Sequence, residues 1–148
     1  MEKSNHLKTL DRLEEVAQQF VRLMQAKMEK ILVHGITGTQ FFVMKKIHEH
    51  GRLTVSAAAD YLGVTLSAIT SLTDRLVKMG FVGRSRDESD RRIVWLEITH
   101  EGEEVLRSCF EGRKRIMEKY LGQLPQEDLN QLLIIFEKLL VIISKEKD

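Results

Sequence analysis

The sequence is poor in cysteine, proline and aromatic residues, and it has no long apolar run. A single cysteine in 148 residues excludes a disulfide within the chain, so we expect the protein in the cytoplasm. One proline and 6% aromatic residues favour helices over a β-rich fold. No apolar run approaches the roughly 18–20 residues that span a bilayer, and the segment MEKSNHLKTLDRLEE lacks the apolar core of a signal peptide. We therefore expect no membrane association.

The chain also has little net charge, +1 in total. With 43% hydrophobic and 30% charged residues it is typical of a globular protein, and its length fits one ordinary domain. Binding to nucleic acid would therefore depend on a local excess of positive charge. Such an excess exists between Thr65 and Arg92, where six Lys or Arg residues accompany four Asp or Glu residues.

What is present is a mainly helical pattern with a small β-hairpin. Apolar residues at helical spacing and glycines that stop helices predict the helices, whereas β-branched runs predict the strands. The expected helices span about residues 7–33, 41–50, 55–62, 66–79, 99–121 and 129–143, and the expected strands span 81–86 and 93–98 after a stub at 52–54. We expect Thr99 to cap its helix and Pro125 to open the last one.

The last expected helix, LNQLLIIFEKLLVII, is apolar on nearly every side. Such a helix must be buried, but one small domain core has limited room for it. Burial against a second copy of the chain, with the first long helix as its companion, solves the problem, and twofold dimers are the commonest soluble oligomers. The alternative is that the terminal helices only cover their own core.

Residues 55–79 have the spacing of a helix-turn-helix. Ala59 is the small residue where the two helices cross, and Gly63 stands where the turn favours a left-handed backbone. The expected buried face comprises Leu62, Val64, Ile69, Leu72 and Leu76. A helical hairpin packed into another kind of core would give a similar pattern.

The outward face of the second of these helices is rich in hydroxyl and basic side chains. Its members are Ser67, Thr70, Ser71, Asp74, Arg75 and Lys78, with Thr65 as the expected N-cap. Short hydroxyl side chains let a helix lie deep in the major groove of double-stranded DNA, and Arg75 and Lys78 can reach phosphates. For Asp74 we favour a pair with Lys78, although a contact to a cytosine amino group or a solvated acid also fits.

The hairpin that follows adds Arg84, Arg86, Arg91 and Arg92. An arginine at a narrow hairpin tip can enter the minor groove, where the negative potential is strong over A·T tracts. We interpret Asp90 as the partner that orients one of these guanidinium groups. In isolation, the same loop would be read as a solvated charge run.

This part of the sequence resembles the MarR family of winged-helix regulators. The resemblance rests on LGVTLSAITSLTDRLVKMGFVGRSRDESDRRIVWLEITHEG, with its DRL, the Met-Gly break, DRR in the wing and IT-x-x-G before the next helix. It implies a winged helix-turn-helix lobe at about 37–99 and dimerisation helices at about 1–36 and 100–148. It also implies a homodimer that represses transcription at pseudo-palindromic sites until a small ligand or an oxidant releases it.

The resemblance assigns further roles by position. Residues 66–79 become the recognition helix, and Arg92, held by Asp90, becomes the minor-groove arginine. Ser71 departs from the pattern, because many relatives have a basic residue there. The family's small-molecule effector pocket would fall near Phe20, Met24, His34, Phe41 and Phe42, which equally fit a plain core.

Other reactive residues give little evidence of chemistry. We interpret Cys109, beside Phe110, as a buried structural thiol without redox function, because no basic neighbour is evident. His48 and His50 are two residues apart, which does not place them on one helical face, so we expect no metal site and no cofactor.

Two alternatives to a DNA-binding regulator remain at this stage. A winged-helix module that contacts only proteins fits Ser71, Asp74 and the low net charge. An enzyme is disfavoured, because the sequence has no Ser/His/Asp order, phosphate-binding glycine loop or metal-ligand spacing.

Overall fold

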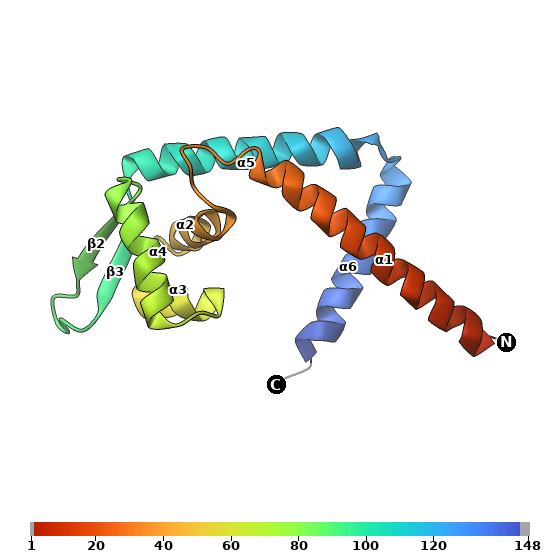
Figure 1. The fold of residues 1–148 in the computed structure, drawn as a ribbon, viewed down its shortest axis with the longest axis horizontal. Helices are drawn as coiled ribbons and strands as arrows, with labels where there is room; N and C mark the ends of the chain where they lie inside the picture. Colours follow the sequence, from red (N-terminus) through yellow and green to blue (C-terminus); the bar gives the residue numbers. More distant parts are fainter. Residues whose placement is uncertain (1, 146–148) are drawn as a thin grey trace. The chain divides into compact units, whose positions relative to one another are not determined.

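The computed structural model describes residues 2–145, which are mainly helical with a small antiparallel sheet (Figure 1). This confirms the expected fold class. In chain order the elements are α1 (Glu2–Glu29), α2 (Gly38–His50), β1 (Arg52–Thr54), α3 (Val55–Leu62), α4 (Leu66–Lys78), β2 (Val82–Arg86), β3 (Val94–Ile98), α5 (His100–Tyr120), a 3-10 turn η1 (Leu121–Gln123) and α6 (Gln126–Lys145). The chain divides within α5 into two compact units, one ending at Gly112 and the other beginning at Arg113.

The first helix differs from its expected bounds. It ends at Glu29, not near residue 33, because Leu32 and Val33 leave the helix and pack against the buried core. The turn that follows places His34 and Gly35 at positive φ. Helix α4 ends at Lys78, with Met79 as its C-cap, one residue earlier than expected.

Threonine side chains start the helices of the helix-turn-helix and its neighbours. Thr37 forms a capping box with Gln40 at the start of α2, and Thr54 and Thr65 accept hydrogen bonds at the starts of α3 and α4. Gly63 closes α3 with φ of 67°, the left-handed conformation that glycine adopts at little cost. Threonine and glycine thus fix both ends of the turn between α3 and α4.

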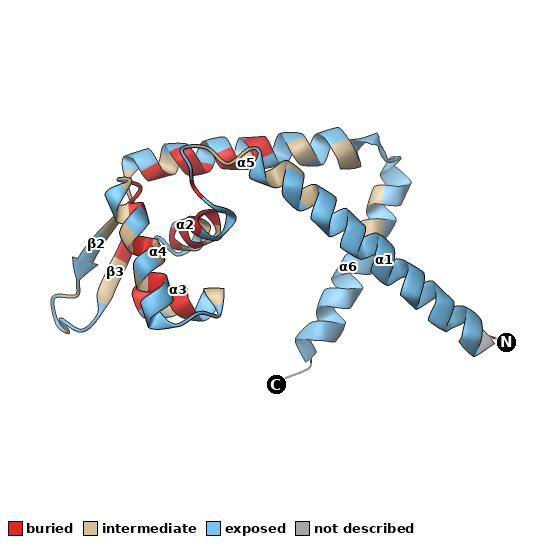
Figure 2. Ribbon diagram, in the orientation of Figure 1, coloured by how far each residue is buried: buried red, intermediate tan, exposed pale blue. Residues whose placement is uncertain are grey.

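The sheet has the order β1-β3-β2, with β3 antiparallel to both neighbours. Its inner face packs on α2, α3, α4 and the first part of α5 around a continuous buried core (Figure 2). The largest fully buried side chains are Met44, Ile47, Ile69, Leu76, Leu96 and Leu106. Cys109 is buried in the same core, as expected.

Most of the face expected to be buried in the helix-turn-helix is buried. Ile69 and Leu76 are fully buried, and Leu62 and Leu72 pack partly against the core. Val64 is 37% exposed, so that part of the prediction is wrong. It lies in the turn itself, where its backbone N–H closes α3 on the carbonyl of Ala59.

The start of α5 depends on Thr99 and Gly102. The Thr99 hydroxyl accepts a hydrogen bond from the backbone of Gly102, as expected of an N-cap, and donates one of 2.6 Å to the carbonyl of Gly80. Gly102 is buried, and a Cβ there would overlap the carbonyl oxygen of Phe81. The α5 helix can therefore approach the α4–β2 turn only because residue 102 has no side chain.

Large apolar side chains remain exposed on two helices of the monomer (Figure 2). Across Gln126–Lys145 no residue is buried, although this helix is rich in Leu, Ile, Val and Phe. On α1 the exposed apolar residues are Leu7, Leu10, Leu13, Val16, Phe20, Val21 and Leu23. Within each unit, the described chain leaves these faces without a cover.

Within residues 2–145 no single helix has both the length and the apolar composition that a membrane span requires. The pair α3 and α4 passes on composition, but the two helices meet at a bend of 109°.

We expect Gly102→Ala to lower the free energy of unfolding by about 1–3 kcal/mol, because the methyl group has no room beside the backbone of Phe81. Urea unfolding followed by circular dichroism measures this. Gly38→Ala is the matched control, because a Cβ there meets no atom within 4 Å, and it should be close to neutral. Equal stability of the two variants would show that the close approach is not present.

Candidate nucleic-acid interface

The exposed face of α4 presents the side chains that the sequence predicted. Ser67, Ser71, Arg75 and Lys78 are exposed, and Thr70 is half-buried. Thr65 accepts a hydrogen bond from the backbone of Ala68 at 3.2 Å and so acts as the N-cap. The hydroxyl of Thr70 donates to the carbonyl of Leu66 at 2.7 Å, which leaves its oxygen free only to accept. Ser67 and Ser71 make no side-chain hydrogen bond with the part of the chain that the structure describes, so their hydroxyls can both donate to and accept from a base edge.

Asp74 pairs with Arg84 of β2, not with Lys78 as the sequence suggested. The Arg84 guanidinium approaches the Asp74 carboxylate to 2.6 Å and also donates to the hydroxyl of Thr73 at 3.1 Å. The Thr73 hydroxyl in turn donates to the carbonyl of Ile69 at 2.9 Å. A guanidinium has several donors in one plane and can hold two neighbouring groups at once, which an ammonium on the same helix does less well.

Thr73 is a residue that the sequence reasoning overlooked. It is fully buried, and with Ile69 and Leu76 it lies on the apolar face of α4 at helical spacing. A hydroxyl on an apolar face needs partners: this one donates to the carbonyl of Ile69 within α4 and accepts from the guanidinium of Arg84. Arg84 thus links α4 to the wing, the hairpin of β2, residues 87–93 and β3.

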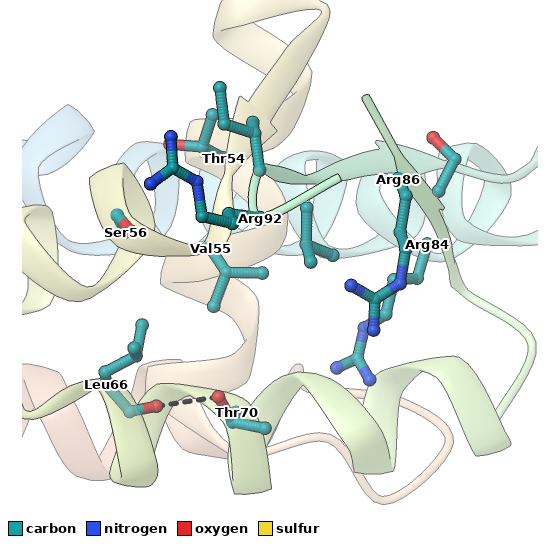
Figure 3. Close-up of a pocket in the computed structure, with 11 residues that line it drawn as sticks. Thr54, Val55, Ser56, Leu66, Thr70, Arg84, Arg86 and Arg92 are labelled. Atoms are coloured by element: carbon teal, nitrogen blue, oxygen red, sulfur yellow. Dashed lines mark hydrogen bonds between the residues drawn. The ribbon is translucent and has the colours of Figure 1, made fainter. Parts of the chain in front are cut away.

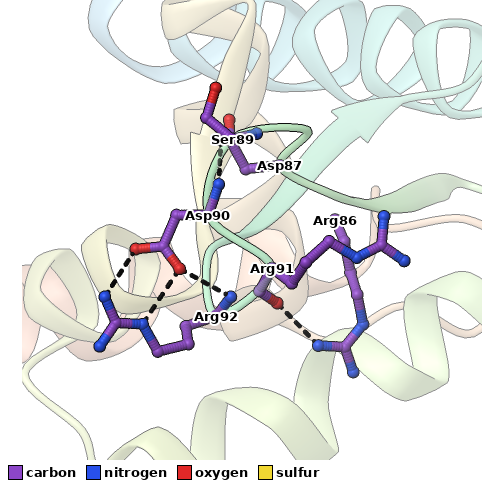
Figure 4. A network of polar contacts seen from close by, with 6 residues as sticks. All are labelled: Arg86, Asp87, Ser89, Asp90, Arg91 and Arg92. Atoms are coloured by element: carbon purple, nitrogen blue, oxygen red, sulfur yellow. Dashed lines mark hydrogen bonds and ion pairs between the residues drawn. The ribbon is translucent and has the colours of Figure 1, made fainter.

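At the wing tip, Asp90 holds Arg92 with both carboxylate oxygens (Figure 4). The Nε and Nη2 atoms of Arg92 each donate to this carboxylate at 3.0 Å, and its backbone N–H adds a third bond at 3.1 Å. The Arg92 side chain is nevertheless 91% exposed. The hydrogen bonds from Arg92 lower the pKa of Asp90, and the same pair raises the pKa of Arg92. The interpretation of Asp90 as an orienting partner is confirmed.

The wing turn itself is closed by Asp87, which the sequence reasoning treated only as part of a polar loop. One of its carboxylate oxygens accepts from the backbone N–H groups of Ser89 and Asp90, both at 3.0 Å. The other accepts from the indole N–H of Trp95 at 2.9 Å. These three bonds, that of Trp95 foremost, lower the pKa of Asp87. Arg86 also ties the loop, because its guanidinium donates to the carbonyl of Arg91 at 2.8 Å.

A cleft of about 710 Å³ separates the wing from α3 and α4 (Figure 3). Its lining residues are Thr54, Val55, Ser56, Leu66, Thr70, Arg84, Ser85, Arg86, Arg92, Ile93 and Val94. Arg84 and Arg86 extend from β2 toward α4, and none of these described lining residues is acidic. The cleft therefore suits a polyanion that runs between the helix-turn-helix and the wing.

The residues expected to form an effector pocket do not line this cleft. Phe41 is buried, Met24 and Phe42 are half-buried, and Phe20 and His34 are exposed. The ring of Phe41 packs edge-on against Phe110 at 5.6 Å between centroids, as a core residue does. An effector site at these residues stays a prediction.

The histidines make contacts of their own. His48 lies 3.0 Å from the carboxylate of Glu103, and His50 lies between the carbonyl of Lys46 and the hydroxyl of Tyr61. In the described part of the chain, no three His, Cys, Asp or Glu side chains gather as a metal ion would require.

Several known proteins are similar to this chain in both sequence and fold. The profile of the MarR family matches residues 36–94. The HTH-type transcriptional repressor MdtR of Bacillus subtilis is 34% identical over 120 residues, which are 81% of this chain and 77% of MdtR. The crystal structure of YusO from Bacillus subtilis has 32% identity and a TM-score of 0.76 over 89% of this chain and 94% of YusO. A mutant MarR from Escherichia coli, solved with operator DNA, has 25% identity and a TM-score of 0.70 over 92% and 96% of the two chains.

We expect Arg92→Ala to raise the pKa of Asp90 toward the ordinary value of about 3.9, because the two side-chain hydrogen bonds are lost and only the bond from the backbone N–H of residue 92 remains. The pKa of Asp87 should stay low, because its main partners are Trp95 and backbone N–H groups. A carboxylate with a lowered pKa stabilises the folded wing above about pH 3.9, and this contribution is lost as the pH falls through the lowered value. Carboxyl chemical shifts in NMR titrations of the parent protein and of Arg92→Ala report the midpoints of Asp90 and Asp87. An unchanged Asp90 midpoint would contradict the paired geometry.

Proposed function

This chain belongs to the MarR family, and we propose that it is a sequence-specific DNA-binding transcriptional regulator of which two copies bind one pseudo-palindromic operator. The observation that carries the proposal is the pairing of an exposed, hydroxyl-lined α4 with an exposed arginine at the wing tip, on either side of an arginine-lined cleft. The E. coli MarR structure solved with operator DNA supports it, as does the naming of the similar proteins as regulators, not enzymes.

We assign different roles to the basic and hydroxyl residues of the interface. Ser67 and Ser71 face base edges in the major groove, whereas Arg75, Lys78 and Arg86 contact phosphates. Arg92 enters the minor groove, with Arg91 at the neighbouring phosphates. Thr65 and Thr70 act through the start of α4, where free backbone N–H groups favour a phosphate.

Arg84 has a different role in this proposal from the direct DNA contact that the sequence suggested. Its guanidinium is held by Asp74 and Thr73, so it sets the distance between α4 and the wing. Asp74 is thereby neutralised by an arginine and no longer repels the phosphates as an unpaired acid would. The two acid–arginine pairs, Asp74 with Arg84 and Asp90 with Arg92, thus leave the Arg92 side chain 91% exposed.

The apolar faces of α1 and α6 support a homodimer. On α6 the exposed apolar residues are Leu133, Ile134, Ile135, Phe136, Leu139, Leu140, Val141, Ile142 and Ile143. Full burial of one such side chain contributes about 1.5–3 kcal/mol, so a face of this size strongly favours association. A second copy of the chain is the occupant that we propose, because two recognition helices are needed for a pseudo-palindrome.

Repression under control of a small-molecule effector completes the proposed function. MdtR is named a repressor, and steric exclusion of polymerase from an operator requires nothing beyond tight binding. A DNA-binding regulator acts where the chromosome is, which for a bacterial relative such as MdtR is the cytoplasm. A winged-helix module that contacts only proteins is the competing function, and it predicts no retention on DNA.

We expect the dimer to bind duplex fragments selected from a random library with an affinity that falls linearly on a log–log plot against salt, because phosphate contacts release counterions. Arg92→Ala should cost about 1–3 kcal/mol of affinity for the selected duplex, as a single lost base contact does. Fluorescence anisotropy at several salt concentrations measures both effects.

Arg107→Ala is the matched control for charge, because Arg107 is an exposed arginine of α5 outside α4 and the wing. It should leave the affinity nearly unchanged. If Arg92→Ala binds as the parent protein does, the minor-groove assignment is wrong. If the parent protein binds no duplex even at low salt, the competing function as a protein-contact module is favoured.

We expect Leu140→Glu to dissociate the dimer, because it places a charge on an apolar face that the second copy covers. Light scattering should then report the mass of one chain, 17.1 kDa, where the parent protein gives twice that mass. Glu137→Gln, an exposed polar position on the same helix, should remain dimeric. A footprint of the parent protein should show two half-sites about 10–10.5 base pairs apart, and one unpaired half-site would contradict the twofold arrangement.

A further inference from the structure

The face of the sheet that points away from the core carries an aromatic–cation contact, between Arg52 and Trp95, apart from the residues proposed to read bases. Along β3, Trp95 and Glu97 alternate with the fully buried Leu96, so they lie on the opposite face. The register pairs Arg52 with Glu97 and Thr54 with Trp95, which places Arg52 diagonally across from the indole. The guanidinium carbon of Arg52 lies 3.8 Å from the centroid of the Trp95 ring. At this distance the cation and the ring attract each other.

The indole of Trp95 is fixed by its edge as well as by its face. Its N–H donates to one oxygen of Asp87 at 2.9 Å, while Arg52 covers the ring. A tryptophan with both the ring face and the N–H engaged has little rotational freedom left. Trp95 therefore offers the Asp87 carboxylate a donor at a fixed position on the central strand.

The Asp87 carboxylate passes this fixed position on to the wing tip (Figure 4). Its second oxygen binds the backbone N–H of Asp90, and the Asp90 carboxylate holds the guanidinium of Arg92. An unbroken series of contacts thus runs from Arg52 in β1, through Trp95 and Asp87, to Arg92. Strand β1 also ends in Thr54, the N-cap of α3, so the same short strand leads into the helix-turn-helix and supports the wing.

We propose that Trp95, backed by Arg52 and acting through Asp87, is a positioning residue that sets the wing tip for DNA binding without contacting the DNA itself. The proposal rests on the proposed function as a DNA-binding regulator. Its physical basis is preorganisation, because a wing arginine that is already oriented loses less conformational freedom when it binds. The Asp87 carboxylate also repels phosphates, so its presence in the wing weakens binding unless its positioning effect is the larger of the two.

This conflict between repulsion and positioning gives a test that depends on sign. Asp87→Asn and Glu88→Gln each remove one negative charge from neighbouring positions of the same loop, but only Asp87 closes the turn. Loss of repulsion alone would tighten DNA binding by both variants. We expect Asp87→Asn to weaken binding to the selected duplex roughly tenfold. The single carbonyl oxygen of Asn can replace only one of the two accepting carboxylate oxygens, so its NH2 group must face either the indole N–H or the backbone N–H groups, from which it cannot accept. We expect Glu88→Gln to bind equally or more tightly.

The contribution of Trp95 is tested by variants that keep the ring or the charge. Trp95→Phe retains an aromatic face for Arg52 but has no N–H for Asp87, and it should weaken DNA binding to about the same extent as Asp87→Asn. Arg52→Lys retains a cation over the ring and should keep more affinity than Arg52→Ala. Rescue by lysine is not expected if Arg52 only fills space on the sheet.

A second measurement reports the contact in the absence of DNA. Trp95 is the only tryptophan of the sequence, so the intrinsic fluorescence of the protein comes from it alone. Asp87→Asn should shift its emission and increase quenching by acrylamide, whereas Glu88→Gln should leave both unchanged. Thermal unfolding by circular dichroism shows that the variants are folded at the temperature of the binding assay.

The outcomes separate the two proposals. If the parent protein binds DNA and Asp87→Asn and Trp95→Phe bind as tightly, the positioning proposal is wrong and the regulator remains. If the emission of Trp95 is the same in Asp87→Asn and the parent protein, the contact on which the proposal depends is absent. If the parent protein binds no DNA at all, both proposals fail together.

Discussion

The pairing of β3 with strands on both of its sides is the constraint on which the interface depends. On one side it pairs with β1, which leads directly into α3. On the other side it pairs with β2, and the loop between those two strands is the wing. Because the buried Leu96 anchors β3 in the core, this one strand fixes the positions of both the helix-turn-helix and the wing. A small sheet can therefore keep the helix-turn-helix and the wing at a defined separation although each is short.

The charge distribution explains how a nearly neutral chain presents a basic surface. The acids of the interface lie next to arginines: Asp74 binds Arg84, and Asp90 binds Arg92. Such pairs add little net charge, but they determine where each guanidinium points, and Arg92 remains 91% exposed beyond its partner. The oxygens of the third acid, Asp87, accept hydrogen bonds from backbone N–H groups and from Trp95. The acids of this interface therefore act by orienting the guanidinium groups, although they lower its net positive charge.

Apolar surface is distributed in two distinct ways. Around Met44, Ile47 and Leu106 it is fully buried by elements of the same chain. On α6 it is exposed from Leu133 to Ile143. A contiguous apolar face of this kind in a monomer marks an interaction surface, which is why the assembled dimer is part of the proposed function.

The sequence by itself determined which segments are helix and strand, because apolar spacing, threonine caps and glycines act through neighbours a few residues away. Thr65, Gly63 and Thr99 have the roles expected of them, and Asp90 holds Arg92 two residues later. Tertiary structure decided the contacts between distant segments. Asp74 pairs with Arg84 and not with Lys78, and the indole N–H of Trp95 donates to Asp87. Helix α1 ends before Leu32 and Val33, which pack against the core. These choices depend on strand register and on the approach of β2 to α4, and local sequence spacing holds no information about either.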